Sequence, residues 1–274
     1  MLPAVVEKIP WTSDFKVDHE TRRVDLQDAS EGKDTSTVCD AAFAKVVAAV
    51  IDQDLFKVVH GQHSELSLVL SAKYPVKIER FTRPLFGFVG CGAHLTAYTR
   101  TTAGLKIWVP RRSPHLKTYP DKLDTTVAGG VKADESPFET IIHEAEEEAS
   151  MPADLLRRNV RPCGVLTYMS TSGQNESGES GLVKPDAIYV YDIEISEDLV
   201  PRPGDDEVKE FYLMSVEDVK KALAAAEFKT NSAVVMLDFF IRHGIISAEN
   251  EEDFVEIRQR MHRRLPFSVV NKRG

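Results

Sequence analysis

The spacing of apolar residues changes along this chain and divides it into two regions. Residues 1–35 are polar and mixed, with no sustained period. From residue 36 to about residue 56, apolar side chains recur at helical spacing, so a helix is expected there. An apolar run at residues 66–70 precedes Tyr74-Pro75, which indicates a turn or an extended break. These patterns predict a small α+β region over residues 1–85.

From Phe86 onward the apolar runs become short and typical of strands. Runs at 86–89 and 94–99 flank Gly90-Cys91-Gly92, which predicts a hairpin or a bulge. Further strands are expected at 105–109, 164–169, 187–195 and 207–214, a polar loop at 170–181, and helices at 216–227, 231–242 and 250–263. This order, with one helix between sets of strands and more helices at the end, favours an α+β fold over residues 86–274.

The helix expected near residues 137–149 has unusually complete start signals. Ser136 is a suitable N-cap, Pro137 suits the first helical position, and Glu139 completes a capping box. At about 100° per residue, the apolar side chains of this segment form one stripe, which predicts a buried face made of Phe138, Ile141, Ile142, Ala145 and Ala149.

The same periodicity places Glu144, Glu147 and Glu148 on one flank of that helix, and Glu146 on the other flank, in solvent. Three carboxylates on one flank repel each other unless a cation lies among them, and oxygen ligands suit Mg²⁺, with Mn²⁺ as a substitute. A glutamate-rich run is usually a solvated face. Here a Gly129-Gly130 turn precedes the helix and would let the backbone approach an ion, which favours a metal site.

Composition narrows the class of partner. The chain has 34 Lys and Arg against 43 Asp and Glu, a formal net charge of −9, which argues against nucleic acid or an anionic membrane. Its three cysteines form no CxxC pair, which predicts free thiols. The first residues do not resemble a signal peptide, and the most apolar stretch, 232–241, is about half a membrane span. We therefore expect a cytoplasmic protein; phosphate-bearing small molecules, which a local basic cluster or a bound cation can hold, are not excluded as partners. The sequence leaves the oligomeric state open.

The segment that begins at Gly129 resembles the Nudix box, G-x5-E-x7-R-E-U-x-E-E-x-G-U, where U is aliphatic. Gly129 matches the first glycine and Glu135 the lone glutamate, and the later glutamates fall on Glu144, Glu147 and Glu148. His143 stands where arginine is usual, and Ser150 where the late glycine is usual. The resemblance implies a Nudix α/β/α sandwich with a mixed sheet and a hydrolase that cleaves a phosphoric anhydride bond.

Other segments look like one Nudix subgroup that carries a family-specific N-terminal region and is fused in some fungi to a thiamine pyrophosphokinase. These segments are 84–87, 106–113, 117–120, 122–124, 127–130, 228–231 and 238–244. The resemblance implies hydrolysis of thiamine diphosphate, or of its oxidised analogues, to the monophosphate and phosphate. A nucleoside diphosphate derivative such as ADP-ribose is the rival substrate, and a non-catalytic ligand sensor is the rival function.

The resemblance also implies roles for individual residues. It places the metal on Glu144, Glu147 and Glu148 with the carbonyl of Gly129, makes Glu144 and Glu147 catalytic, and gives Gly130 and Glu135 to the motif. His143 is expected to contact a glutamate of the box. A glutamate outside the box often completes such a site or serves as general base, and Glu207 and Glu210 are equal candidates.

Several residues are candidates for binding the substrate. Arg111 and Arg112 follow a strand and suit fork-shaped hydrogen bonding to a diphosphate, with Lys117 and Lys184 as further candidates. Aromatic side chains in strands are usually core, but four of them are candidates for stacking on a substrate ring: Phe86, Phe88, Trp108 and Tyr119.

Overall fold

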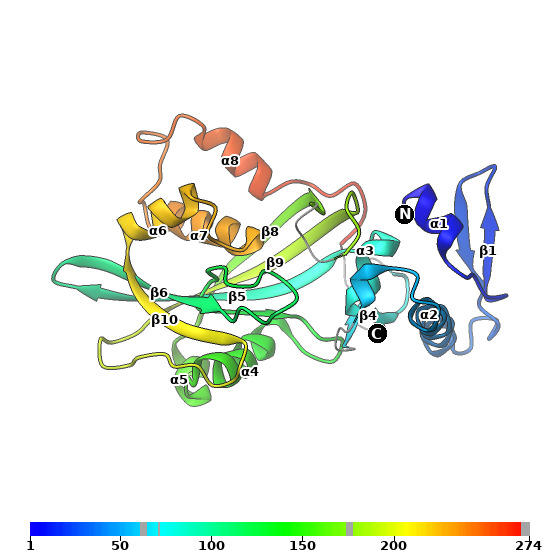
Figure 1. The fold of residues 1–274 in the computed structure, drawn as a ribbon, viewed down its shortest axis with the longest axis horizontal. Helices are drawn as coiled ribbons and strands as arrows, with labels where there is room; N and C mark the ends of the chain where they lie inside the picture. The colour runs from blue at the N-terminus through cyan, green and yellow to red at the C-terminus, as the bar shows by residue number, and fades with distance from the viewer. Residues whose placement is uncertain (61–64, 71, 174–177, 270–274) are drawn as a thin grey trace.

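The computed structural model describes residues 1–60, 65–70, 72–173 and 178–269. Within these residues a six-stranded mixed sheet forms the centre of the larger region (Figure 1). Its strands are β5 (Gly90–Thr101), β6 (Gly104–Arg112), β7 (Val127–Gly130), β8 (Arg161–Thr171), β9 (Val183–Glu194) and β10 (Val208–Ser215). The order is β10-β6-β5-β9-β8, with β7 also paired to β5. β5 and β9 are parallel, and the other pairs are antiparallel.

Helices cover both faces of this sheet. α4 (Pro137–Ala149) and α5 (Ala153–Asn159) lie on one face, and α6 (Val216–Ala224) and α7 (Thr230–Arg242) lie on the other (Figure 1). The α4 face packs through Ile141 and Ile142, and the α7 face through Phe239 and Phe240, all without measurable exposure. α8 (Phe254–Met261) contacts β8. The predicted α+β fold with helices on both faces of a mixed sheet is confirmed.

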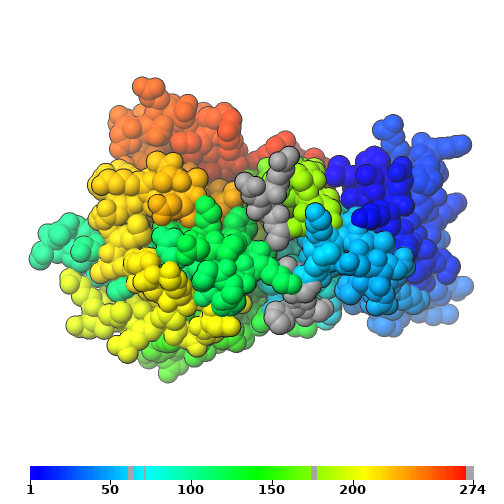
Figure 2. Space-filling view, viewed as in Figure 1, coloured from blue at the N-terminus to red at the C-terminus, as the bar shows by residue number. Residues whose placement is uncertain are grey.

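The N-terminal region has its own small core. Its elements are α1 (Pro3–Lys8), β1 (Phe15–Asp18), β2 (Arg23–Leu26), α2 (Thr35–Asp52), the 3-10 turns Lys57–Val59 and Arg80–Thr82, β3 (Leu66–Leu68), β4 (Lys77–Glu79) and α3 (Arg83–Phe86). Phe43 of α2 meets Phe15 and Phe86 edge to face, and Leu182, just before β9, joins the same apolar cluster. The region therefore packs against the rest of the chain, and its surface adjoins that of the sheet region (Figure 2).

The hairpin or bulge expected around Gly90-Cys91-Gly92 is wrong. α3 ends at Gly87, whose φ of 69° suits glycine, and β5 then runs from Gly90 to Thr101 without a break. These glycines lie in a strand because of their neighbours. A Cβ on Gly90 would lie 2.3 Å from Oδ1 of Asp186, and one on Gly92 would lie 3.1 Å from Cδ1 of Ile188. Likewise, Gly129 and Gly130 end strand β7 and do not form the expected turn.

The strand expected at residues 86–89 is wrong, because Phe86 ends α3 and residues 87–89 form a turn and a short connection to β5. The other predicted elements are present with shifted ends. The helix expected from residue 36 is α2, the four later strands correspond to β6, β8, β9 and β10, and the three last helices correspond to α6, α7 and α8. The last helix is shorter than predicted at both ends, because residues 250–253 are not helical and the helix ends at Met261. Of the expected polar loop, residues 170 and 171 belong to β8, and residues 174–177 lie outside the described residues. No helix in the described ranges is long and apolar enough to cross a membrane.

Candidate active site

A cavity of about 460 Å³ lies between the sheet, α4, the segment before β10 and the N-terminal region. This volume is within the range of small-molecule pockets. Carboxylates of Glu144, Glu147, Glu148 and Glu207 line it, together with the cations Arg112, Lys184 and Lys229. The cavity therefore brings together carboxylates and cations from segments far apart in the sequence.

The predicted start of α4 is confirmed, and its end shows how the box tolerates Ser150. Ser136 accepts a hydrogen bond from the backbone N–H of Glu139 at 3.1 Å, as an N-cap does. The carboxylate of Glu139, expected to complete a capping box, instead binds Arg157 of α5 with two hydrogen bonds, of 2.7 and 2.6 Å. Ser150 ends the helix in the left-handed conformation, with φ 52°, the position where the box usually has glycine.

The glutamates of α4 differ in burial as their helical positions predict. Glu148 is 7% exposed, Glu144 is half-buried, and Glu147 is at the exposed rim of the cavity. Glu146, expected in solvent, is exposed. Burial raises the pKa of Glu144 to about 7, with Glu147 and Glu207 adding to the shift. Burial also raises the pKa of Glu148, and Glu144 raises it further. Both carboxylates thus need a compensating cation to ionise together.

Gly129 is required by the packing of Glu144. A Cβ at Gly129 would lie 2.5 Å from both Cγ and Oε1 of Glu144, which real structures do not allow. The first glycine of the box therefore lets strand β7 pass directly beside this carboxylate.

His143 contacts a box glutamate, as predicted. Its Nδ1 atom lies 3.0 Å from Oε1 of Glu135, and the hydroxyl of Thr140 donates to Oε2 of Glu135 at 3.1 Å. The contact between His143 and Glu135 therefore ties the loop before α4 to the helix.

The structure distinguishes Glu207 from Glu210, the two candidates outside the box for completing the site or serving as general base. Glu207 lines the cavity beside the α4 carboxylates, and it raises the pKa of both Glu144 and Glu148. Glu210 accepts a hydrogen bond of 2.5 Å from the hydroxyl of Tyr212 and lies outside the cavity lining. The pairing of β10 with β6 shifts register between Val208 and Glu210, so the two glutamates sit on either side of an irregularity.

Of the four cationic residues predicted to bind the substrate, two line the main cavity and two do not. Arg112 and Lys184 line the cavity. Arg111 donates to the carbonyl of Asp121 at 2.9 Å and to Glu227 at 3.4 Å, because successive residues of a strand point to opposite faces. Lys117 donates to the carbonyl of His60 at 2.8 Å and lines a smaller neighbouring cavity of about 320 Å³. Among the aromatic candidates, Phe88 and Tyr119 line the main cavity, whereas Phe86 and Trp108 belong to the apolar core.

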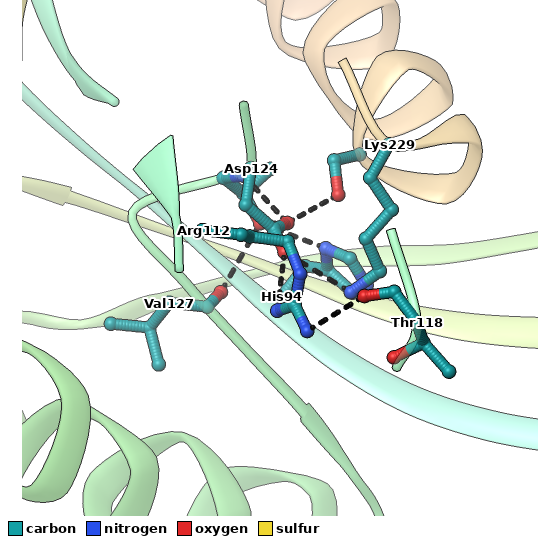
Figure 3. A network of polar contacts seen from close by, with 8 residues as sticks. His94, Arg112, Thr118, Asp124, Val127 and Lys229 are labelled. Carbon is teal, nitrogen blue, oxygen red and sulfur yellow. Dashed lines mark hydrogen bonds and ion pairs between the residues drawn. The ribbon is translucent and has the colours of Figure 1, made fainter. Parts of the chain in front are cut away.

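A buried polar network surrounds Arg112 (Figure 3). Its centre is Asp124, whose Oδ2 lies 3.1 Å from Nζ of Lys229 and 3.4 Å from Nη1 of Arg112. Oδ1 of Asp124 accepts from the hydroxyl of Ser232 and from the backbone N–H of Thr125. Asp124 and Lys229 are not among the site residues predicted from the sequence. Their pairing is the part of the site that no local pattern reveals.

This network has more positive than negative charge. Burial opposes the ionisation of Asp124, but Lys229 and Arg112 outweigh it and lower the pKa of that carboxyl to about 2. His94 adds no charge, because burial and Lys229 lower its pKa to about 3. One carboxylate therefore faces two cations, and Nε of buried Arg112 has no hydrogen-bond partner within the described part of the chain. Such a group suits an anion such as a phosphate.

The raised pKa of Glu144 predicts how stability depends on pH. Because its pKa is higher in the folded state than the ordinary 4.5, the metal-free protein loses about 3 kcal/mol of stability as pH rises from about 4.5 to 7. We expect Glu144→Gln to stabilise the metal-free protein by about that amount at pH 8 and by little at pH 4. Urea unfolding in a chelator measures this, with exposed Glu146→Gln as the control. An equal effect at both pH values would contradict the shift.

Residues 95–234 match the family model of the NUDIX domain, so the chain belongs to the Nudix family. The uncharacterized protein YJR142W of Saccharomyces cerevisiae is 38% identical over 220 residues, which cover 78% of this chain and 64% of that protein. Nudix hydrolase 20, chloroplastic, of Arabidopsis thaliana is 29% identical over 224 residues, 81% of this chain and 58% of that protein. The chain thus spans about 60% of the length of these two relatives.

Among solved structures, the chain is similar to DR0079 from Deinococcus radiodurans, with 23% identity and a TM-score of 0.44. The similarity covers 63% of this chain and 97% of that one.

Proposed function

We propose that this protein is a Mg²⁺-dependent Nudix hydrolase that cleaves the diphosphate of thiamine diphosphate, or of its oxidised analogues, to the monophosphate and phosphate. The observation that carries the reaction class is the juxtaposition within one cavity: half-buried Glu144 and buried Glu148 next to the excess positive charge of Arg112 and Lys229. The first group suits a cation and the second suits the phosphates. The thiamine assignment is supported by the subgroup resemblance of the segments that hold Arg112, Asp124 and Lys229.

The donor atoms fit Mg²⁺, with Mn²⁺ as a substitute. Glu144, Glu147, Glu148 and the carbonyl of Gly129 offer only oxygen, which hard divalent cations prefer. The carboxylates of Glu144 and Glu148 would gain the positive charge that they lack, and the missing Cβ of Gly129 leaves room beside Glu144. Across the described residues, no three carboxylate, imidazole or thiol side chains already form a metal-binding group. The fit therefore rests on donor chemistry, burial and charge.

The residues of the cavity have different roles in the proposed hydrolysis. Bound Mg²⁺ supplies positive charge that offsets the repulsion between the diphosphate oxygens and an incoming nucleophile. Arg112 and Lys229 hold phosphate oxygens by charge-assisted hydrogen bonds, and Asp124 fixes both cations in place. Glu207 accepts the proton of the attacking water, since it is the glutamate outside the box that lines the cavity. The water oxygen bonds to phosphorus as the anhydride bond breaks, which releases the monophosphate and phosphate.

Glutamine variants test the choice between Glu207 and Glu210. We expect Glu207→Gln to lower kcat by about 10²- to 10⁴-fold, as the loss of a general base does, with KM little changed. Glu210→Gln removes a partner of Tyr212 outside the cavity and should change kcat by less than about threefold. Steady-state phosphate release measures both. The reverse order of effects would assign the base to Glu210.

A substrate panel tests the proposed function as a whole. The purified protein is incubated with Mg²⁺ and thiamine diphosphate, its oxidised analogues, ADP-ribose, NADH or dinucleoside polyphosphates, and products are identified by mass. Preferential formation of thiamine-type monophosphates would support the proposal. Cleavage of ADP-ribose alone would support the reaction class and contradict thiamine diphosphate as the substrate. Tight binding of one compound without turnover of any would favour the sensor.

A further inference from the structure

The cavity extends beyond the charged groups to a polar row that crosses three strands of the sheet. Asp186 of β9 pairs with Gly90 of β5 on one side and with Tyr168 of β8 on the other. A Cβ atom on residue 90 would lie 2.3 Å from Oδ1 of Asp186. Because Gly90 has no Cβ, the carboxylate of Asp186 has room beside it. This row lies two residues along β5 from Gly92, which pairs with Gly130 at the box. The separation along the strand is about 7 Å, so the row lies within reach of a substrate whose diphosphate is held at the box.

The N-terminal region completes this end of the cavity. Arg83 of α3 lines it, and its Nε donates to the carbonyl of Arg80 at 3.1 Å. The Nη1 atom of Arg83 and the hydroxyl of Tyr168 are both buried, and neither has a hydrogen-bond partner among the residues with described positions. Buried donors without partners are rare in folded proteins and indicate a partner that binds there.

Arg83 and Asp186, which both line this end of the cavity, carry opposite charges. Burial lowers the pKa of Arg83, and the nearby carboxylate of Asp186 opposes that shift and so favours the charged guanidinium. A further anion would be repelled by Asp186, and a further cation by Arg83. The pair therefore favours a neutral group that both accepts and donates hydrogen bonds. The rings of Phe88 and Tyr119 also line the cavity, which suits a flat partner.

We propose that Arg83, Tyr168 and Asp186 form a recognition subsite for a neutral, amino-substituted nitrogen heteroaromatic ring of the substrate. A ring nitrogen accepts from Arg83 or Tyr168, and the amino group donates to Asp186. The inference rests on the proposed function, because the ring belongs to the group that carries the diphosphate. It assigns the N-terminal region a part in substrate selection through Arg83.

Two conservative variants test the subsite: Tyr168→Phe removes only a hydroxyl, and Asp186→Asn keeps the shape beside Gly90. Each is assayed with thiamine diphosphate and with methyl diphosphate, which has no ring. We expect kcat/KM for thiamine diphosphate to fall about 10- to 100-fold, mostly through KM, and kcat/KM for methyl diphosphate to stay within about twofold. Tyr191→Phe, a buried tyrosine of β9 outside the cavity lining, is the matched control.

The outcomes separate the subsite from the proposed substrate. Equal losses with both diphosphates would show a structural effect and overturn the subsite, as would no loss with either. If the wild-type protein cleaves ADP-ribose and not thiamine diphosphate, the proposed substrate is wrong. The variants should still lose activity on ADP-ribose, because its adenine ring also carries an amino group next to a ring nitrogen. If nothing is cleaved, calorimetry of thiamine diphosphate with Ca²⁺ decides: binding weakened about tenfold or more by Tyr168→Phe supports the subsite, and unchanged or absent binding overturns it.

Discussion

Replacing Glu148 by glutamine is expected to lower diphosphate hydrolysis by about a thousandfold or more, because a metal site contributes several kcal/mol to catalysis. Glu148 is the most buried carboxylate of α4 and shares the cavity with Glu144 and Glu207. A neutral amide of the same shape cannot supply the negative charge that holds the cation there. Phosphate release at saturating Mg²⁺, with the Mg²⁺ dependence followed over a wide range, measures the loss.

The matched control lies two residues away on the same helix. Glu146→Gln removes the same charge from the exposed flank of α4 and should leave hydrolysis within about twofold of wild type. Without metal, Glu148→Gln should raise the Tm at pH 8, because burial disfavours the ionised carboxylate. Similar activities for the two variants would show that Glu148 holds no metal.

The acidic helix was predictable because its signals are local. The N-cap, the apolar stripe and the positions of the glutamates all depend on residues within one turn or a few turns of each other, and the structure keeps them. The spacing of the box extends that local information to Gly129 and Glu135. Family membership could therefore be inferred from one short segment and was confirmed by the match over residues 95–234.

The opposite wall of the site could not be predicted in this way. Asp124 and Lys229 are 105 residues apart, and they meet only because β6, the segment after it and α7 converge. No period or motif links residues so distant. Strand alternation could have shown that Arg111 and Arg112 face opposite ways, but not which of them faces the cavity. The glycines at 90 and 92 were misleading, because glycine marks close packing inside a strand as well as turns.

The second large effect is expected at Asp124. Asp124→Asn should cost about 3–5 kcal/mol of stability and lower the Tm by about 10 °C, since buried Arg112 and partly buried Lys229 would lose their shared counter-charge. Hydrolysis should fall as well, because the two cations lose the group that holds them in place. Asp121→Asn is the control: its side chain is 56% exposed, its ion pairs are 3.9 Å long, and asparagine tolerates its φ of 56°.

Acid unfolding provides an independent readout of the same network. The pKa of Asp124 is about 2 in the folded protein, below the ordinary 3.8, so its ionised form is stabilised by folding. That contribution, about 2 kcal/mol, is present above pH 4 and is lost as pH falls toward 2. The stability difference between wild type and Asp124→Asn should therefore shrink over this interval, whereas that for Asp121→Asn stays near zero. A difference that does not change with pH would show that Asp124 contributes packing and hydrogen bonds, and that its charge does not organise Arg112 and Lys229.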